Sequence, residues 1–259
     1  MGTSRRGFLQ SIAAGSAMAV VHAPAASAEE KTRFDFSTDV VVVGLGAAGA
    51  ATAITAADKG TQVLVIERQP LKTLRSNTRM SGGYIHCPEK NGDKKALNDY
   101  FAALFSAGYD GLPSVGEDDV VSQGMAKHWT DITPRLVDWL KSLDPDLKML
   151  KTGGGAQYVN FPGAKTCSYG VYRTSYKDVI DNKTTTYNRP KPEATEGEAL
   201  HRALLNGIEL RKDKITVMDG CRAQELIAEK SGRIIGIIAE NSHRRKEGRR
   251  ALLRRLRVR

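Results

Sequence analysis

Three glycines and one acid between Asp39 and Glu67 have the types and spacing needed to hold a nucleotide. Gly44, Gly46 and Gly49 follow the pattern G-x-G-x-x-G, and Glu67 lies about 20 residues further on. Gly44 permits a tight turn, Gly46 lets backbone N–H groups approach a pyrophosphate, and Gly49 allows close packing of a helix on a strand. We expect Glu67 to accept hydrogen bonds from the hydroxyls of an adenosine ribose.

The elements around these residues have the order that such a site requires. The apolar run Val40 to Val43 predicts a strand, and the Ala-rich segment from Ala47 to Lys59 predicts a helix. Gly60 stands where a helix C-cap is expected, and Gln62 to Ile66 predicts a second strand. The helix N-terminus offers N–H groups and partial positive charge to phosphates. The alternative is an ordinary βαβ unit whose glycines serve packing alone.

A second polar segment, Ser76 to Gly83, follows this unit. Small polar side chains precede a glycine pair, which lets backbone lie close to a ligand. We therefore expect a loop that lies against the cofactor. Without the preceding glycine pattern, a plain surface turn would be the better interpretation.

The segment SNTRMSGGYIHCP resembles the second flavin-contacting segment of the fumarate reductase/succinate dehydrogenase flavoprotein superfamily. That group includes soluble fumarate reductases, urocanate reductase and 3-ketosteroid dehydrogenases. Membrane-bound members carry a histidine near the start of the segment that bonds covalently to the flavin. Because Ser76 and Asn77 stand there, the resemblance implies non-covalent FAD, and His86, beyond the glycines, is read as structural. The cofactor-binding residues that we expect are Gly44, Gly46, Ala47, Ala48, Gly49, Glu67, Arg68, Ser76, Asn77, Thr78, Ser81, Gly82 and Gly83.

The remaining pattern predicts an α/β fold: a Rossmann-like FAD-binding domain with a parallel sheet, a helical insertion and a small β-meander. The insertion covers residues 95–150, where Thr133 is expected to cap a helix, and 151–192 is expected to form irregular loops with one short hairpin. Glu196 to Asn206 predicts a helix with Gly207 as its C-cap. Three short strands are expected to follow, at Lys214 to Met218, Ala223 to Ala228 and Arg233 to Ala239.

The first residues have the features of an export signal. A twin-arginine pattern from Ser4 to Gln10 precedes an apolar stretch from Ile12 to Val21 and the small-residue cleavage site Ala26-Ser27-Ala28. We expect residues 1–28 to be a signal peptide read by the twin-arginine export machinery, which places the mature protein in the periplasm or cell envelope. The alternative is a chance pair of arginines.

The other end of the chain is strongly basic. Residues 242–259 contain eight Arg and one Lys against one Glu, whereas the formal charge of the whole chain is +10. We expect a FAD-binding domain at 29–241, without the cap and last flavin segment of the family, its sheet incomplete, and a tail at 242–259 that has left its reading frame. The simpler alternative is a tail in the correct reading frame that is exposed to solvent. A basic arm also suits nucleic acid or an anionic membrane, but an exported flavoprotein gives little reason to expect a nucleic-acid partner.

The sequence assigns no catalytic and no metal-binding residue. Cys87, Cys167 and Cys221 are far apart, and they form neither a C-x-x-C pair nor a haem attachment site. In the whole enzyme, the resemblance implies hydride transfer between flavin and an activated C=C bond of a small organic substrate. Electrons would then come from an external donor such as a separate cytochrome.

Two other functions remain open at this point. One is a 3-ketosteroid dehydrogenase-type flavoprotein, whose segment has the same length from Asn77 to Gly83. The other is a non-catalytic remnant that binds a dinucleotide. We expect the chain alone to bind FAD weakly and to turn over no substrate.

Overall fold

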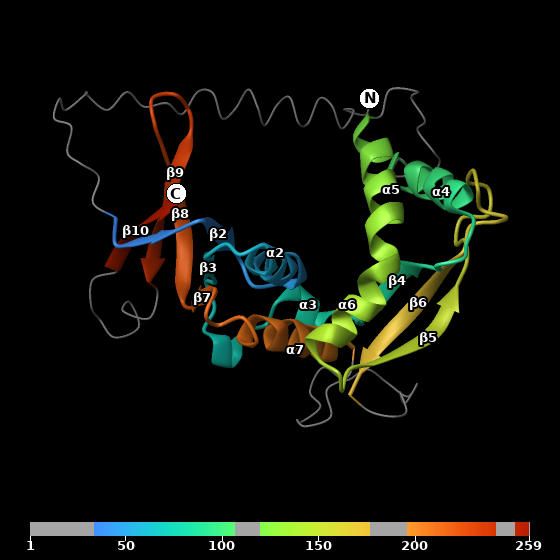
Figure 1. Cartoon of the computed structure of the whole chain (residues 1–259), viewed down its shortest axis with the longest axis horizontal. Helices are drawn as coiled ribbons and strands as arrows, with labels where there is room; N and C mark the ends of the chain where they lie inside the picture. The colour runs from blue at the N-terminus through green and yellow to red at the C-terminus, as the bar shows by residue number, and fades with distance from the viewer. Residues whose placement is uncertain (1–33, 107–119, 177–195, 242–251, 259) are drawn as a thin grey trace, which may run out of the picture. The chain divides into compact units, whose positions relative to one another are not determined.

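The computed structural model describes residues 34–106, 120–176, 196–241 and 252–258, which contain three separate β-sheets and the helices between them (Figure 1). The expected signal peptide at 1–28 lies outside the described residues. In the part that is described, no helix is long and apolar enough to cross a membrane.

A three-stranded parallel sheet carries the glycine pattern. Its order is β2 (Val40–Val43), β3 (Val63–Ile66), β7 (Ile215–Met218), and α2 (Ala47–Asp58) connects β2 to β3. The expected strand, turn, helix and strand are confirmed, and the strand expected at Lys214 to Met218 joins the same sheet as β7.

The central strand β3 is buried on both faces, which explains its continuous apolar sequence. Val63 and Val65 belong to a core shared with the helices α2, α6 (Leu136–Leu143) and α7 (Glu196–Glu209). Leu64 and Ile66 point the other way, into a core shared with the second sheet.

The second sheet has the order β1 (Phe36–Thr38), β10 (Leu252–Val258), β9 (Ile234–Asn241), β8 (Cys221–Ala228). The antiparallel pair β8–β9 confirms the predicted β-meander. The strand β10 lies within the basic tail expected at 242–259, and it pairs antiparallel with β9 and parallel with β1. Leu256 of β10 is 0% exposed and completes the core under Leu64 and Ile66.

The helix α7 is longer than predicted. Gly207 was expected to end it, but the helix continues to Glu209 and Gly207 is buried within it. A Cβ at this position would lie 2.8 Å from Ile54 Cδ1 and 3.0 Å from Leu143 Cδ2. The glycine therefore permits close packing of α7 against α2 and α6.

One prediction within the helical insertion is wrong. Its described residues include α4 (Lys94–Ser106), α5 (Val120–Ile132), the 3₁₀ turn η2 (Thr133–Arg135) and α6. Thr133 does not cap a new helix. Its hydroxyl donates to the carbonyl of Trp129 in the preceding turn, so η2 continues α5 directly into α6.

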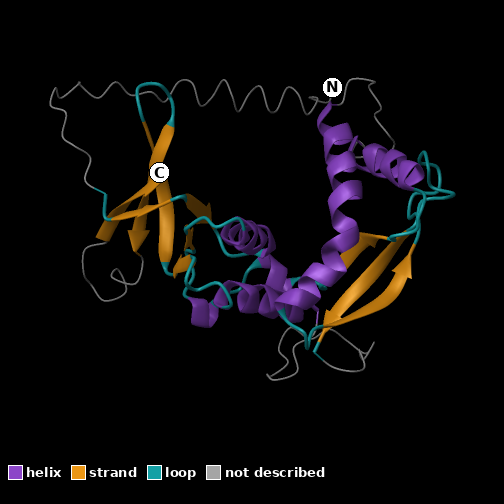
Figure 2. Cartoon of the chain, in the orientation of Figure 1, coloured by secondary structure: helices purple, strands orange, loops and turns teal. Residues whose placement is uncertain are grey.

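The region after residue 151, expected to form irregular loops with one short hairpin, contributes two antiparallel strands to a third sheet. It has the antiparallel order β4 (Tyr84–Pro88), β6 (Tyr169–Ser175), β5 (Lys148–Gly154) (Figure 2). The part of the expected loop region from 177 to 192 lies outside the described residues. Tyr169 of β6 packs with Tyr100 and Phe101 of α4, which joins this sheet to the helical insertion.

Candidate nucleotide site

The glycine turn between β2 and α2 is held by contacts that only glycine permits. Gly44 has a φ of +94°, in the region that glycine favours. A Cβ on Gly49 would lie 2.0 Å from the carbonyl oxygen of Gly44, so the helix packs directly on the turn. Gly46 differs, because the nearest heavy atom to its Cβ position is Thr78 Oγ1 at 3.5 Å. The protein leaves room beside Gly46, as close approach of a ligand requires.

Glu67 supports the turn from the end of β3. The residue is 6% exposed, and its carboxylate accepts hydrogen bonds from Leu45 N and Gln69 N, both at 2.8 Å, through different oxygens. Each oxygen has a further lone pair, so ribose binding is compatible with these bonds and stays a prediction. The sequence did not reveal that Glu67 binds the backbone of the glycine turn.

His201 was missed by sequence reasoning. It lies on α7, is 4% exposed, and its Nε2 is 3.2 Å from the carbonyl oxygen of Leu45. Burial lowers the pKa of the His201 imidazole below its ordinary value. A signal was present in the sequence, because His201 shares a helix face with Gly197, Leu200, Leu204 and Ile208, all of which are buried. A histidine at a core position indicates a specific partner.

The second predicted segment lies against the helix N-terminus, but it is not a loop throughout. Residues Asn77–Met80 form a helical turn, α3, and the Ser76 hydroxyl accepts a hydrogen bond from Arg79 N at 3.2 Å. The Thr78 hydroxyl accepts a hydrogen bond from Ala47 N at 2.8 Å. The structure therefore brings the two predicted segments together, and the first N–H of α2 has a protein partner.

The glycine pair after α3 packs against the start of α7. Gly83 has a φ of +63°, and a Cβ there would lie 2.1 Å from the carbonyl carbon of Glu196. Gly197 N donates to Ser81 O at 3.1 Å. A Cβ on Gly82 would meet the Tyr84 ring at 3.0 Å. These contacts explain the glycines by packing, and their predicted role beside the flavin is not tested by them.

Two ion pairs join α7 to its neighbours. Arg79 of α3 lies 2.9 Å from Glu198 and also donates to the carbonyl of Leu74. Arg173 of β6 pairs with Glu196 at the start of α7. The side chains of the second pair are about nine-tenths buried, so the first turn of α7 is fixed from two sides.

The predicted site residues differ in exposure. Ala48, Arg68, Asn77 and Ser81 are exposed, whereas the others lie partly or fully within the packed turn and segment. Arg68 follows β3 on the surface and makes no polar contact with the described residues. The structure thus places a core of glycines, Glu67 and Thr78 together and leaves Arg68 at the edge.

The turn suits an anionic dinucleotide. The first turn of α2 carries no acidic side chain, and its N-cap residue Gly46 has no side-chain cap. Within the described residues, Gly46 N has no hydrogen-bond partner. A helix N-terminus with an N–H group available and no acid in its own first turn favours a phosphate. The residues present therefore fit the pyrophosphate of FAD.

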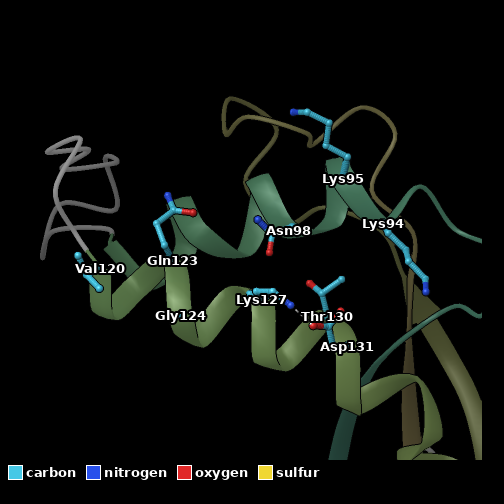
Figure 3. A pocket seen from close by; sticks show the side chains of 9 residues that line it. All are labelled: Lys94, Lys95, Asn98, Val120, Gln123, Gly124, Lys127, Thr130 and Asp131. Atoms are coloured by element: carbon cyan, nitrogen blue, oxygen red, sulfur yellow. Dashed lines mark hydrogen bonds and ion pairs between the residues drawn. The ribbon is translucent and has the colours of Figure 1, made fainter.

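A groove of about 720 Å³ between α4 and α5 is separate from these residues (Figure 3). Lys95 and Lys127 line it, but each is paired with an aspartate one helical turn further on, Asp99 and Asp131. None of the predicted site residues lines this groove. No group of three His, Cys, Asp or Glu side chains within the described ranges is placed to hold a metal ion.

The family of the chain follows from this fold and from sequence comparison. Residues 39–256 match the FAD binding domain family, and the chain belongs to this family. Its cofactor is FAD. The match includes most of β10, whereas we expected the resemblance to end at Asn241.

The curated relatives are flavoprotein reductases. A fumarate reductase (cytochrome) of Shewanella frigidimarina is 30% identical over 147 residues, which is 56% of this chain and 24% of the relative. A digoxin reductase of Eggerthella lenta is 25% identical over 91% of this chain and 42% of its own length. The chain therefore matches less than half the length of either relative.

Solved structures share the fold at low identity. A 3-ketosteroid-Δ4-(5α)-dehydrogenase from Rhodococcus jostii superposes with a TM-score of 0.60 at 20% identity, covering 89% of this chain and 46% of that one. The open conformation of a flavocytochrome c3 fumarate reductase gives 0.53 at 15% identity, covering 99% and 35%.

Proposed function

We propose that this chain carries the FAD-binding part of an exported oxidoreductase of the fumarate reductase type. The observation that carries the proposal is the turn at Gly46, which offers an N–H group beside a helix whose first turn carries no acidic residue. Bound FAD supplies the hydride chemistry, and the protein supplies position and electrostatics. The substrate would be a small organic molecule with an activated C=C bond.

In this proposal, different residues bind different parts of the cofactor. Gly46 and Ala48 contact the pyrophosphate, Glu67 binds the adenosine ribose, and the segment Ser76 to Gly83 lies along the flavin. The flavin stays non-covalent, since neither Ser76 nor Asn77 offers an imidazole for attachment. Thr78 already joins the two segments through Ala47 N, which supports a shared binding surface.

Electron supply and location complete the proposal. The relative from Shewanella frigidimarina is named fumarate reductase (cytochrome), and the present sequence has no C-x-x-C-H site. We therefore assign the donor role to a separate cytochrome. The twin-arginine pattern at residues 4–10 supports export of the folded, FAD-loaded protein.

Two measurements on the purified full-length chain test this function. FAD titration followed by flavin fluorescence gives the Kd, with Gly46→Ala as the binding variant. Reduced methyl viologen oxidation is then followed with fumarate, acrylate or a 3-ketosteroid that carries a conjugated C=C bond as acceptor. FAD binding supports the proposed FAD-binding part. Oxidation that depends on fumarate or acrylate supports the full function and would show that the expected lack of turnover by the chain alone is wrong, whereas steroid-dependent oxidation assigns the chain to the steroid dehydrogenase type.

A second candidate function is dinucleotide binding without turnover. It is favoured by the hydrogen bonds around the turn, because the side chains of Glu67, Thr78 and His201 all contact backbone groups of the protein. FAD binding with no oxidation for any acceptor supports this candidate. No FAD binding at all contradicts both.

A further inference from the structure

Both backbone groups of Leu45, the residue between the first two glycines of the turn, are held by buried side chains. Leu45 N donates to Glu67 Oε2 at 2.8 Å, and Leu45 O lies 3.2 Å from His201 Nε2. The two partners come from different elements, the end of β3 and the middle of α7. The turn is thus fixed at its centre from two directions.

Because the peptide group is planar, these contacts fix the direction of the neighbouring backbone groups. In a trans peptide the carbonyl and the following N–H point in opposite directions. Glu67 holds Leu45 N, so the carbonyl of Gly44 must point the other way, and it lies against Gly49 as this requires. By the same reasoning, a carbonyl of Leu45 held toward His201 directs the N–H of Gly46 away from α7.

We propose that His201 is a positioning residue for the cofactor, which aims Gly46 N–H at the pyrophosphate by holding the carbonyl of Leu45. The inference rests on the FAD site described above. His201 makes no contact with the cofactor itself in this role. It acts by fixing the peptide group between Leu45 and Gly46, and Glu67 fixes the peptide group between Gly44 and Leu45.

The chemistry of the contact fixes the form of the imidazole. A carbonyl oxygen only accepts hydrogen bonds, so Nε2 of His201 carries the proton. Burial favours the neutral ring. The charged groups that act on it are Arg79 of α3, Glu67 at the end of β3 and Glu198 of α7 itself. Arg79 opposes protonation of the ring, and the two carboxylates favour it.

Three substitutions at one position test the role. In His201→Gln the side-chain amide nitrogen reaches about as far as Nε2 and keeps a donor. His201→Asn is polar but too short, and His201→Leu has no donor. We expect His201→Leu and His201→Asn to weaken FAD binding about tenfold, because a buried carbonyl loses its donor, and His201→Gln to stay within about threefold of wild type. His128→Leu, at an exposed position on α5, is the matched control and should leave the Kd unchanged.

A second measurement needs no bound FAD and separates positioning from simple stability. The ¹H–¹⁵N resonance of Gly46 in the FAD-free protein should move in His201→Leu and His201→Asn and return toward its wild-type position in His201→Gln. If His201 only stabilises the fold, the thermal midpoint falls while the Gly46 resonance and the FAD Kd stay at wild-type values, and the inference is overturned. If wild type binds no FAD, the proposed function fails, and the Gly46 resonance alone decides this inference.

Discussion

Ala47 N donates a 2.8 Å hydrogen bond to the hydroxyl of Thr78, 31 residues further along the chain. The bond replaces the side-chain cap that the glycine before α2 cannot supply. It also fixes the distance between the glycine turn and the second predicted segment. One hydroxyl therefore serves both the start of a helix and the assembly of the site.

Replacing this hydroxyl should destabilise the protein. We expect Thr78→Val to lower the free energy of unfolding by about 1–2 kcal/mol, the usual cost of losing a helix N-cap. Thr78→Ser keeps the acceptor and should retain most of that stability. Urea unfolding followed by circular dichroism gives the comparison. A loss in Thr78→Ser with none in Thr78→Val would show that the methyl contact, and not the hydrogen bond, is responsible.

Gly49 and Gly124 should respond differently to the same added methyl group. Gly49→Ala places a Cβ 2.0 Å from Gly44 O, so we expect a loss of more than about 3 kcal/mol or insoluble protein. Gly124→Ala, in the open on α5, meets nothing within 4 Å and should stabilise by up to about 1 kcal/mol. Chemical unfolding of the two variants tests the pair, and similar values would contradict it.

Gly46→Ala should instead separate binding from folding. Its φ of −86° suits alanine, and its Cβ would make only an ordinary contact with Thr78. We expect an unfolding midpoint near that of wild type together with FAD binding weakened about tenfold or more, because the methyl group enters the space that the pyrophosphate needs. Unchanged FAD affinity would exclude close approach of the cofactor at Gly46.

Burial of His201 predicts a pH dependence of stability. Its folded-state pKa lies below the ordinary value of about 6.5. As pH falls below about 6.5, the unfolded chain binds a proton first, so the free energy of unfolding decreases until the folded-state pKa is passed. The loss between pH 8 and pH 5.5, measured by urea unfolding, should be smaller in His201→Gln. An equal loss in both proteins would assign the pH effect to other groups.

The strand β10 should be required for a stable fold. Leu256→Ala removes a fully buried side chain between β3 and the second sheet, and we expect a cost of about 2–5 kcal/mol. Leu226→Ala on β8 removes a side chain that is 58% exposed and should change stability by less than about 0.5 kcal/mol. Thermal unfolding compares the two, and a small effect at Leu256 would argue against its place in the core.

Local signals predicted the centre of the fold, and long-range pairing decided the parts that were missed. Gly44, Gly46 and Gly49 lie between an apolar strand and a small-residue helix, so spacing alone indicated the βαβ unit. The strands β5 and β6 contain Gly, Thr and Tyr, and they form a sheet with β4 from much earlier in the chain. No local pattern reports such a partner.

The same reason accounts for β10 and His201. Arginines dominate the sequence around Leu256, and the strand forms because β9 and β1 offer hydrogen-bond partners on both sides. His201 lies in a well-predicted helix, but its partner is a carbonyl 156 residues earlier. Periodicity identifies the buried face of a helix and does not identify what that face contacts.

The parallel pairing of Phe36 with Leu256 has a consequence for how the molecule is made. The ribosome synthesises β1 long before β10. The strand β1 therefore has no pairing partner until the rest of the chain has emerged. Contacts between such distant residues slow folding. The pairing of β1 with β10 can therefore form only after the glycine turn and its helix have been synthesised.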